Sequence, residues 1–170
     1  CNRMNNHCDN DWFGRDGVFN TENADNTWTV SEGKIEFPKQ KNWQHYVDSR
    51  RLEITCGEAP YLVSRYDVST GELIVPPIRR IGILDRKLRI VNENTDTYEE
   101  WLKWTTRAFE ASYGYEYQGD NVLIARVNLL LTFTDYYEER WGQQPDGKLL
   151  DQIANKIAWN IWQMDGLKDT

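Results

Sequence analysis

The residues that decide the fold run Leu52-Glu53-Ile54-Thr55-Cys56-Gly57-Glu58-Ala59-Pro60-Tyr61-Leu62. The first four residues form a short strand-like segment in which apolar and polar side chains alternate. Cys56 and Gly57 then end the strand in a turn, where a glycine allows a positive φ or a close approach of the backbone to a bound group. A strand that runs directly into a glycine turn is the first element expected of a doubly wound α/β domain.

Helices dominate the chain after this region. Residues Val68 to Val91 still have a β-like pattern, with a turn at Gly71 and the Pro76-Pro77 pair interrupting any helix. Thr97 is a typical N-cap residue, and two glutamates follow it in the first turn. The pattern predicts a helix from Tyr98 up to Gly114.

Two more helices and a strand are expected beyond this point. Asp120 is predicted to cap a helix through Tyr137 that is apolar on most sides, so we expect that helix to be buried. A third helix is predicted over Lys148 to Ala158, and the alternating residues Trp159 to Met164 indicate a strand that ends at Asp165-Gly166. The order strand, glycine turn, helix, acidic turn, helix, strand, aspartate is that of half a doubly wound α/β domain.

The first 48 residues are rich in asparagine and turn signals. Residues Thr27 to Val30 and Lys34 to Phe37 flank a Ser-Glu-Gly turn and predict a short hairpin. We therefore expect an irregular N-terminal segment, residues 1–48, joined to an α/β domain, residues 49–170, as one compact unit.

Composition limits the class of protein. The 170 residues carry a net charge of −7, and this length can bury a core without disulfides or metal. No apolar run approaches the roughly 20 residues that span a bilayer. The three cysteines, Cys1, Cys8 and Cys56, are an odd and sparse set that indicates a reducing compartment, the cytoplasm. They lack the paired spacing of structural zinc sites, so we expect no metal.

The negative charge is unevenly distributed. Residues 49–91 carry eight basic and five acidic side chains, whereas the other segments are acidic. Five positive charges fall within eleven residues, as phosphate contacts with double-stranded DNA would require: Arg79, Arg80, Arg86, Lys87 and Arg89. The alternative is a solvated, salt-bridged face, which charge alone favours somewhat.

The stretch around Gly57 resembles the first motif of adenine-specific DNA methyltransferases. The matching residues are Glu53, Cys56, Gly57, Tyr61 and Leu62, and Ala59 stands where that family usually has a second glycine. The resemblance implies a Rossmann-like methyltransferase half-core. It further implies that the glycine turn approaches S-adenosylmethionine and that Glu53 supports the turn.

Two later segments resemble further motifs of the same family. Glu116, followed by the Ala125-Arg126-Val127-Asn128-Leu129 run, matches the acid that accepts hydrogen bonds from the cofactor ribose. Asp165 matches the aspartate that accepts from the adenine amino group. The chain as a whole is similar to bacterial methylation subunits of restriction-modification systems, which implies another subunit as a partner.

One motif of that family has no match. Amino-methyltransferases use Asn or Asp followed by Pro-Pro and an aromatic residue to bind the flipped base, and here the Pro-Pro pair lies between Val75 and Ile78. The catalytic residues are therefore unknown, and we expect no methylation by this chain alone. Two other interpretations stay open, a degenerate methyltransferase fold that binds a protein in phage defence or counter-defence, and a subunit that only assembles with others.

Overall fold

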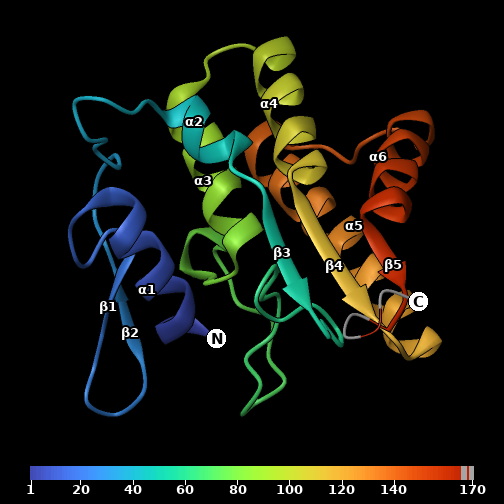
Figure 1. The fold of residues 1–170 in the computed structure, drawn as a ribbon. Helices are drawn as coiled ribbons and strands as arrows, with labels where there is room; N and C mark the ends of the chain where they lie inside the picture. Colours follow the sequence, from blue (N-terminus) through green and yellow to red (C-terminus); the bar gives the residue numbers. More distant parts are fainter. Residues whose placement is uncertain (166–167, 169–170) are drawn as a thin grey trace.

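The computed structural model describes residues 1–165 and 168. This part of the chain is a mixed α/β structure with six α-helices, a parallel three-stranded sheet and a two-stranded ribbon (Figure 1). The elements are, in order, α1 (Asn2–Phe13), β1 (Asn20–Glu22), β2 (Trp28–Val30), α2 (Trp43–Asp48), β3 (Arg51–Ile54), the 3-10 turn η1 (Pro77–Arg79), α3 (Ile83–Asn94), α4 (Tyr98–Glu110), β4 (Ser112–Glu116), α5 (Gly119–Trp141), α6 (Gly147–Asn160) and β5 (Ile161–Gln163).

The parallel sheet has the order β3-β4-β5, so each strand lies beside the next one in the sequence. Glu53 is opposite Gly114, which is in turn opposite Ile161. Each connection passes through two helices, α3 and α4 between the first two strands and α5 and α6 between the last two. Parallel neighbours need such long crossovers, and their carboxyl ends meet at one edge of the sheet.

The two faces of this sheet differ in burial. In β4 the residues Ser112, Gly114 and Glu116 are buried, and Tyr113 and Tyr115 between them are only partly covered. On the same face as these tyrosines, side chains of the neighbouring strands are about half exposed: Leu52, Ile54 and Trp162. Within the described residues, one face of the sheet is thus well buried along β4, and the other is partly open.

The predicted N-cap at the start of α4 is confirmed, and Asp146 caps α6 in the same way. The Thr97 side chain accepts from the backbone N–H of Glu100 at 3.2 Å, and the Asp146 side chain accepts from that of Leu149 at 2.8 Å. Each cap satisfies an N–H that the helix cannot pair internally. α4 ends at Glu110 rather than near Gly114, because Gly114 belongs to β4.

Other local predictions are wrong. Residues 83–94 form the helix α3 instead of continuing a β-like pattern, and residues 2–13 form α1 where an irregular segment was expected. β2 pairs with β1 rather than with residues 34–37, because the backbone N–H of Ile35 donates to the side chain of Glu93 at 2.9 Å. α5 begins at Gly119 after an N-cap at Gln118, two residues before the predicted cap Asp120.

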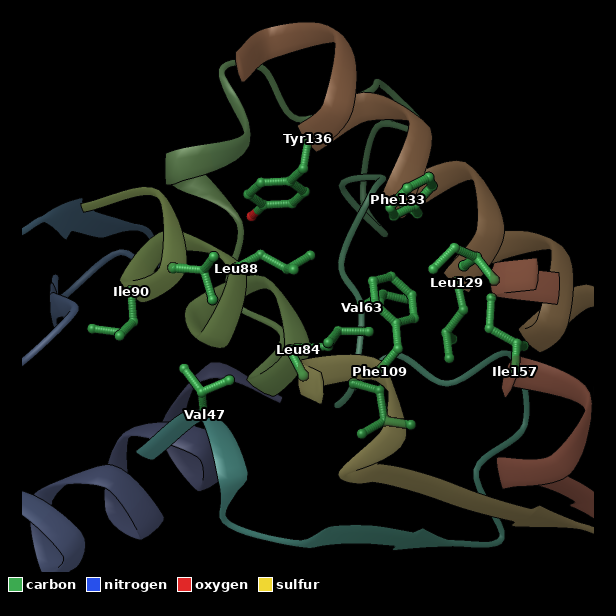
Figure 2. Packing of buried hydrophobic residues seen from close by; sticks show 14 of the residues in the cluster. Val47, Val63, Leu84, Leu88, Ile90, Phe109, Leu129, Phe133, Tyr136 and Ile157 are labelled. Carbon is green, nitrogen blue, oxygen red and sulfur yellow. The ribbon is translucent and has the colours of Figure 1, made fainter. Parts of the chain in front are cut away.

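A continuous core joins the N-terminal segment to the rest of the chain. Figure 2 shows Leu129, Phe133 and Tyr136 of α5 in this core together with Leu84 and Leu88 of α3. The same cluster includes residues from the first 48 positions: Phe13, Val18, Phe19, Ile35, Tyr46 and Val47. The hydrophobic burial that drives folding is therefore shared between the two expected parts of the chain.

α5 is not buried on all sides, contrary to the prediction. Its core-facing residues include Val122, Ala125 and Leu129, but four apolar side chains of the same helix are exposed: Leu123, Ile124, Val127 and Leu131. None of the helices in residues 1–165 and 168 combines the length and apolar character needed to cross a bilayer.

Candidate functional site

The turn after β3 is unusually tight. Thr55, Gly57 and Ala59 all have left-handed backbone conformations, with φ of 54°, 55° and 63°. For the two residues that have a Cβ this conformation costs about 1–2 kcal/mol each. A Cβ built on Gly57 would meet nothing within 4 Å, so the backbone at this glycine borders open space.

Glu53 connects the far end of this turn to β3 through hydrogen bonds. Its two carboxylate oxygens accept from the backbone N–H groups of Tyr61 at 3.4 Å and Leu62 at 3.2 Å. Burial raises the pKa of Glu53 to about 7, although these two hydrogen bonds favour the ionised form. The carboxylate therefore supports the loop of residues 55–62, and its charge is sensitive to pH near neutrality.

Glu116, at the end of β4, connects the turn to the neighbouring strand. Its Oε2 accepts from the backbone N–H of Gly57 at 2.7 Å, and its Oε1 accepts from that of Gln118 at 2.9 Å. These hydrogen bonds, that from Gln118 first, hold the pKa of Glu116 below its ordinary value despite burial. The Asn121 side chain and the backbone of Tyr117 also form hydrogen bonds that lower the pKa of Glu116, so groups of this chain surround the carboxylate.

Asp165 lies just beyond the third strand. The backbone N–H of Met164 donates to the carbonyl oxygen of Glu116 at 3.0 Å, which holds the chain after β5 beside the end of β4. Asp165 follows directly and forms an ion pair with Lys168 at 3.7 Å. The ends of the three strands thus bring the turn at Gly57, Glu116 and Asp165 to one edge of the sheet.

Cys56 belongs to the packing under this edge. The residue is buried, and a Cβ built on Gly114 would lie 3.0 Å from its sulfur. Burial raises the pKa of the Cys56 thiol to about 12, and the nearby carboxylates of Glu53 and Glu116 add to the shift. The thiol is therefore un-ionised at neutral pH and is unsuited to nucleophilic attack.

Three further polar residues hold the site, and sequence reasoning missed them. The side-chain amide of Asn128 donates to the carbonyl oxygen of Glu58 at 3.2 Å, fixing the glycine turn to α5. The side-chain amide of Gln163 donates to the carbonyl oxygen of Tyr117 at 3.2 Å, and Gln118 donates to Glu116. The amide side chain of Gln163, at the end of its strand, is a local signal of this kind. Asn128 lies within α5 and Gln118 donates through its backbone N–H, so neither carries that signal.

A cavity of about 610 Å³ lies beside the turn. It lies between the β1-β2 ribbon and residues 58–69, and its lining includes Trp28, Glu58, Pro60, Tyr66 and Asn128. Glu116 and Asp165 are not among its lining residues. The cavity therefore does not extend to these two acids.

The basic stretch is mostly interior, so the expected surface for DNA phosphates is not formed. Arg80 pairs with Asp135, Arg86 with Asp9 and Arg89 with Glu93, at N–O distances of 2.7–2.8 Å. Lys87 donates to the carbonyl oxygens of Ser49 and Ala111, and burial lowers its pKa to about 7. All four of these basic side chains are buried, and Arg79 alone of the five is exposed. Four of the predicted phosphate contacts therefore stabilise the fold instead.

Comparisons with protein-family models, with curated proteins and with solved structures found no match to the chain. The geometry of the site is consequently the basis for a functional proposal.

Proposed function

We propose that the carboxyl edge of the β3-β4-β5 sheet binds S-adenosylmethionine, and that the chain is the cofactor-binding part of a DNA adenine methyltransferase of a restriction-modification system. The observation that carries the proposal is the 2.7 Å hydrogen bond from Gly57 to Glu116. It brings the glycine turn of one parallel strand against the acid of the next, as a cofactor that touches both would require. Ligands of open α/β sheets bind at this edge.

The donor and acceptor groups fit such a cofactor. The open space beside Gly57 admits the close approach of a ligand to the backbone. Glu116 would accept hydrogen bonds from the two ribose hydroxyls in place of present donors such as the Asn121 side chain. Asp165 would accept from the adenine amino group. Bound there, the cofactor supplies an activated methyl group, and the residues of this chain bind and orient it.

The arrangement of the sheet supports a Rossmann-like half-core. Three parallel strands follow one another in space in their sequence order, and each connection is helical. Ala59 replaces the second glycine of the resembling motif, yet it already has the left-handed φ of 63° that a glycine would favour. The turn thus keeps its shape without that glycine.

The proposal does not include methylation by this chain alone. Its Pro76-Pro77 pair begins η1, and Pro77 is buried there. These prolines are part of a structural turn and do not present an Asn or Asp side chain to a base. Methyl transfer to DNA would require the catalytic motif from another segment or subunit, which is the partner that we propose.

Isothermal titration calorimetry with S-adenosylmethionine tests the proposal. We expect saturable binding to the folded chain, weakened about tenfold or more by Glu116→Ala and by Asp165→Ala. Glu72→Ala, in an exposed loop away from the sheet, is the matched control and should bind normally. Absence of heat at millimolar ligand, with a folded protein by circular dichroism, would refute the cofactor site.

A second function is favoured by the burial of the basic stretch. If the fold is a degenerate methyltransferase that binds a protein, neither cofactor binding nor retention of DNA is expected. A gel-shift assay with double-stranded DNA separates the two. Salt-sensitive retention supports the methyltransferase part, whereas its absence together with silent calorimetry supports the binding protein.

A further inference from the structure

The outer side of α5 is an apolar surface without a covering element in the described part of the chain. Leu123, Ile124, Val127 and Leu131 are 64%, 40%, 46% and 38% exposed. At about 100° per residue they fall on one side of the helix. The opposite side of the helix carries Leu129 and Phe133, which point into the core in Figure 2. We define the four exposed residues as the α5 stripe.

Acidic side chains stand at both ends of the α5 stripe. Asp120 precedes it and is exposed, and Glu138 follows it at an angle on the helix that matches that of Asp120. The two acids are 18 residues apart, which is about 27 Å along the helix axis. The outward side of α5 therefore carries an acidic residue before the α5 stripe and another one after it.

The two basic residues of α5 point away from this side. Arg126 donates to the carbonyl oxygen of Ile161 at 2.7 Å, and Arg140 donates to that of Thr95 at 2.6 Å. Their guanidinium groups are held by the ends of other elements and cannot neutralise Asp120 or Glu138 on the outer side. The α5 stripe thus lies between two acidic side chains that form no ion pair within residues 1–165 and 168.

The size of the α5 stripe and the charges beside it indicate which kind of partner would bind it. Four side chains expose roughly a few hundred Å² of apolar surface, less than the ~800 Å² per partner of a standard protein interface. A second copy of this chain, docked stripe to stripe about a two-fold axis, would bring Asp120 of one copy near Glu138 of the other, and this like-charge contact opposes dimerisation. A single helix matches both the width and the length of the surface.

We propose that the α5 stripe is a docking site for an amphipathic helix of a protein partner, with apolar side chains opposite the stripe and Lys or Arg about 18 residues apart, opposite Asp120 and Glu138. The apolar side chains of the partner would cover the stripe, and its basic ends would pair with Asp120 and Glu138. This is helix recognition by apolar anchors with charges that fix the register. The argument for this site does not depend on cofactor binding at the sheet edge.

The probe is a fluorescently labelled synthetic helix of about 22 residues, with Leu at alternating three- and four-residue spacing and two Lys at each end. One matched control peptide replaces the lysines by Glu, and another replaces the leucines by Ser. Fluorescence anisotropy with the full chain should show saturable binding of the first peptide and about tenfold weaker binding of each control.

Variants locate the site. Val127→Gln with Leu131→Gln should weaken binding about tenfold or more, whereas Leu52→Gln, at a comparably exposed position on the sheet, should not change it. Asp120→Asn with Glu138→Gln should weaken binding about threefold at low salt and leave it unchanged at high salt, where charges are screened. All substituted positions are exposed or partly exposed, and circular dichroism checks the fold.

Other outcomes overturn the proposal. Absence of binding, or equal loss in the Leu52→Gln control, rejects the α5 stripe as the site. Equal binding of the Lys and Glu peptides rejects the basic partner. If sedimentation velocity shows a dimer and Val127→Gln abolishes that dimer, the occupant of the α5 stripe is a second copy of the chain.

Discussion

The backbone N–H of Gly57 and the Oε2 of Glu116 lie 2.7 Å apart, joining the turn after β3 to the end of β4. The same carboxylate accepts from Gln118, and together these hydrogen bonds lower its pKa. The folded state therefore gains stability from ionised Glu116 at pH values above its ordinary pKa near 4.5, and loses it as the pH falls through the lowered value.

Glu116→Gln should remove this acid sensitivity. We expect the variant to lose about 1–2 kcal/mol of unfolding free energy near pH 7, because a neutral amide cannot accept both charged hydrogen bonds. Its stability should also decline less than that of the wild type below about pH 4.5. Urea denaturation at several pH values measures both effects, and parallel curves for the two proteins would contradict the prediction.

Glu53 should give the opposite pH dependence. Burial raises its pKa from an ordinary value of 4.5 to about 7, so between these values the folded protein holds a proton that the unfolded chain releases. The unfolding free energy should then fall as the pH rises from about 4.5 to 7 and level off above. Glu53→Gln should flatten this part of the curve, and Glu72→Gln should leave it unchanged. An unaltered slope in Glu53→Gln would exclude Glu53 as its source.

Two glycines should differ in their tolerance of a methyl group. A Cβ on Gly82 would lie 2.3 Å from the carbonyl oxygen of Leu62, so the backbone must move, and Gly82→Ala should cost about 2–3 kcal/mol. Gly57→Ala meets no atoms and should cost about 1 kcal/mol from its positive φ alone. Chemical denaturation ranks the two variants, and the reverse order would contradict the steric argument.

Because most residues of the basic stretch form buried ion pairs, substitutions within it should differ in their effect on stability. Arg86→Ala would leave Asp9 buried without the guanidinium that it now pairs with at 2.7 Å, which should cost about 3–5 kcal/mol. Arg79→Ala removes an exposed side chain and should change stability by less than about 0.5 kcal/mol. Thermal unfolding of both variants measures these effects. Similar losses of stability would show that burial does not determine the effect of these two substitutions.

Elements with local signals were predictable from the sequence. The cap at Thr97 and the strand before Gly57 depend on residues within a few positions of one another. α3 was missed because its charged residues, including Asp85, Arg86 and Lys87, are buried. Their partners lie far away in the sequence, as Asp9 does for Arg86, so the local pattern does not show which side of the segment is buried and predicts a β-like segment instead.

The candidate site was predictable in its order but not in its contacts. The positions of Gly57, Glu116 and Asp165 at the ends of successive strands follow from the alternation of strands and helices. The direct hydrogen bond from Gly57 to Glu116, and the anchoring of the turn by Asn128, depend on how the strands and α5 meet in space. Spacing along the chain contains no information about those distances.

Any side chain at position 114 would share one space with the Cys56 side chain in the packing between β4 and the turn. A methyl group on Gly114 would lie 3.0 Å from the Cys56 sulfur and 3.1 Å from Cδ1 of Ile161. Gly114→Ala should therefore destabilise the protein, and adding Cys56→Ala should restore part of the loss, a coupling that a double-mutant cycle measures. Homologous chains are then expected to conserve the combined size of the two side chains rather than either identity, so that a larger residue at 114 accompanies a smaller one at 56.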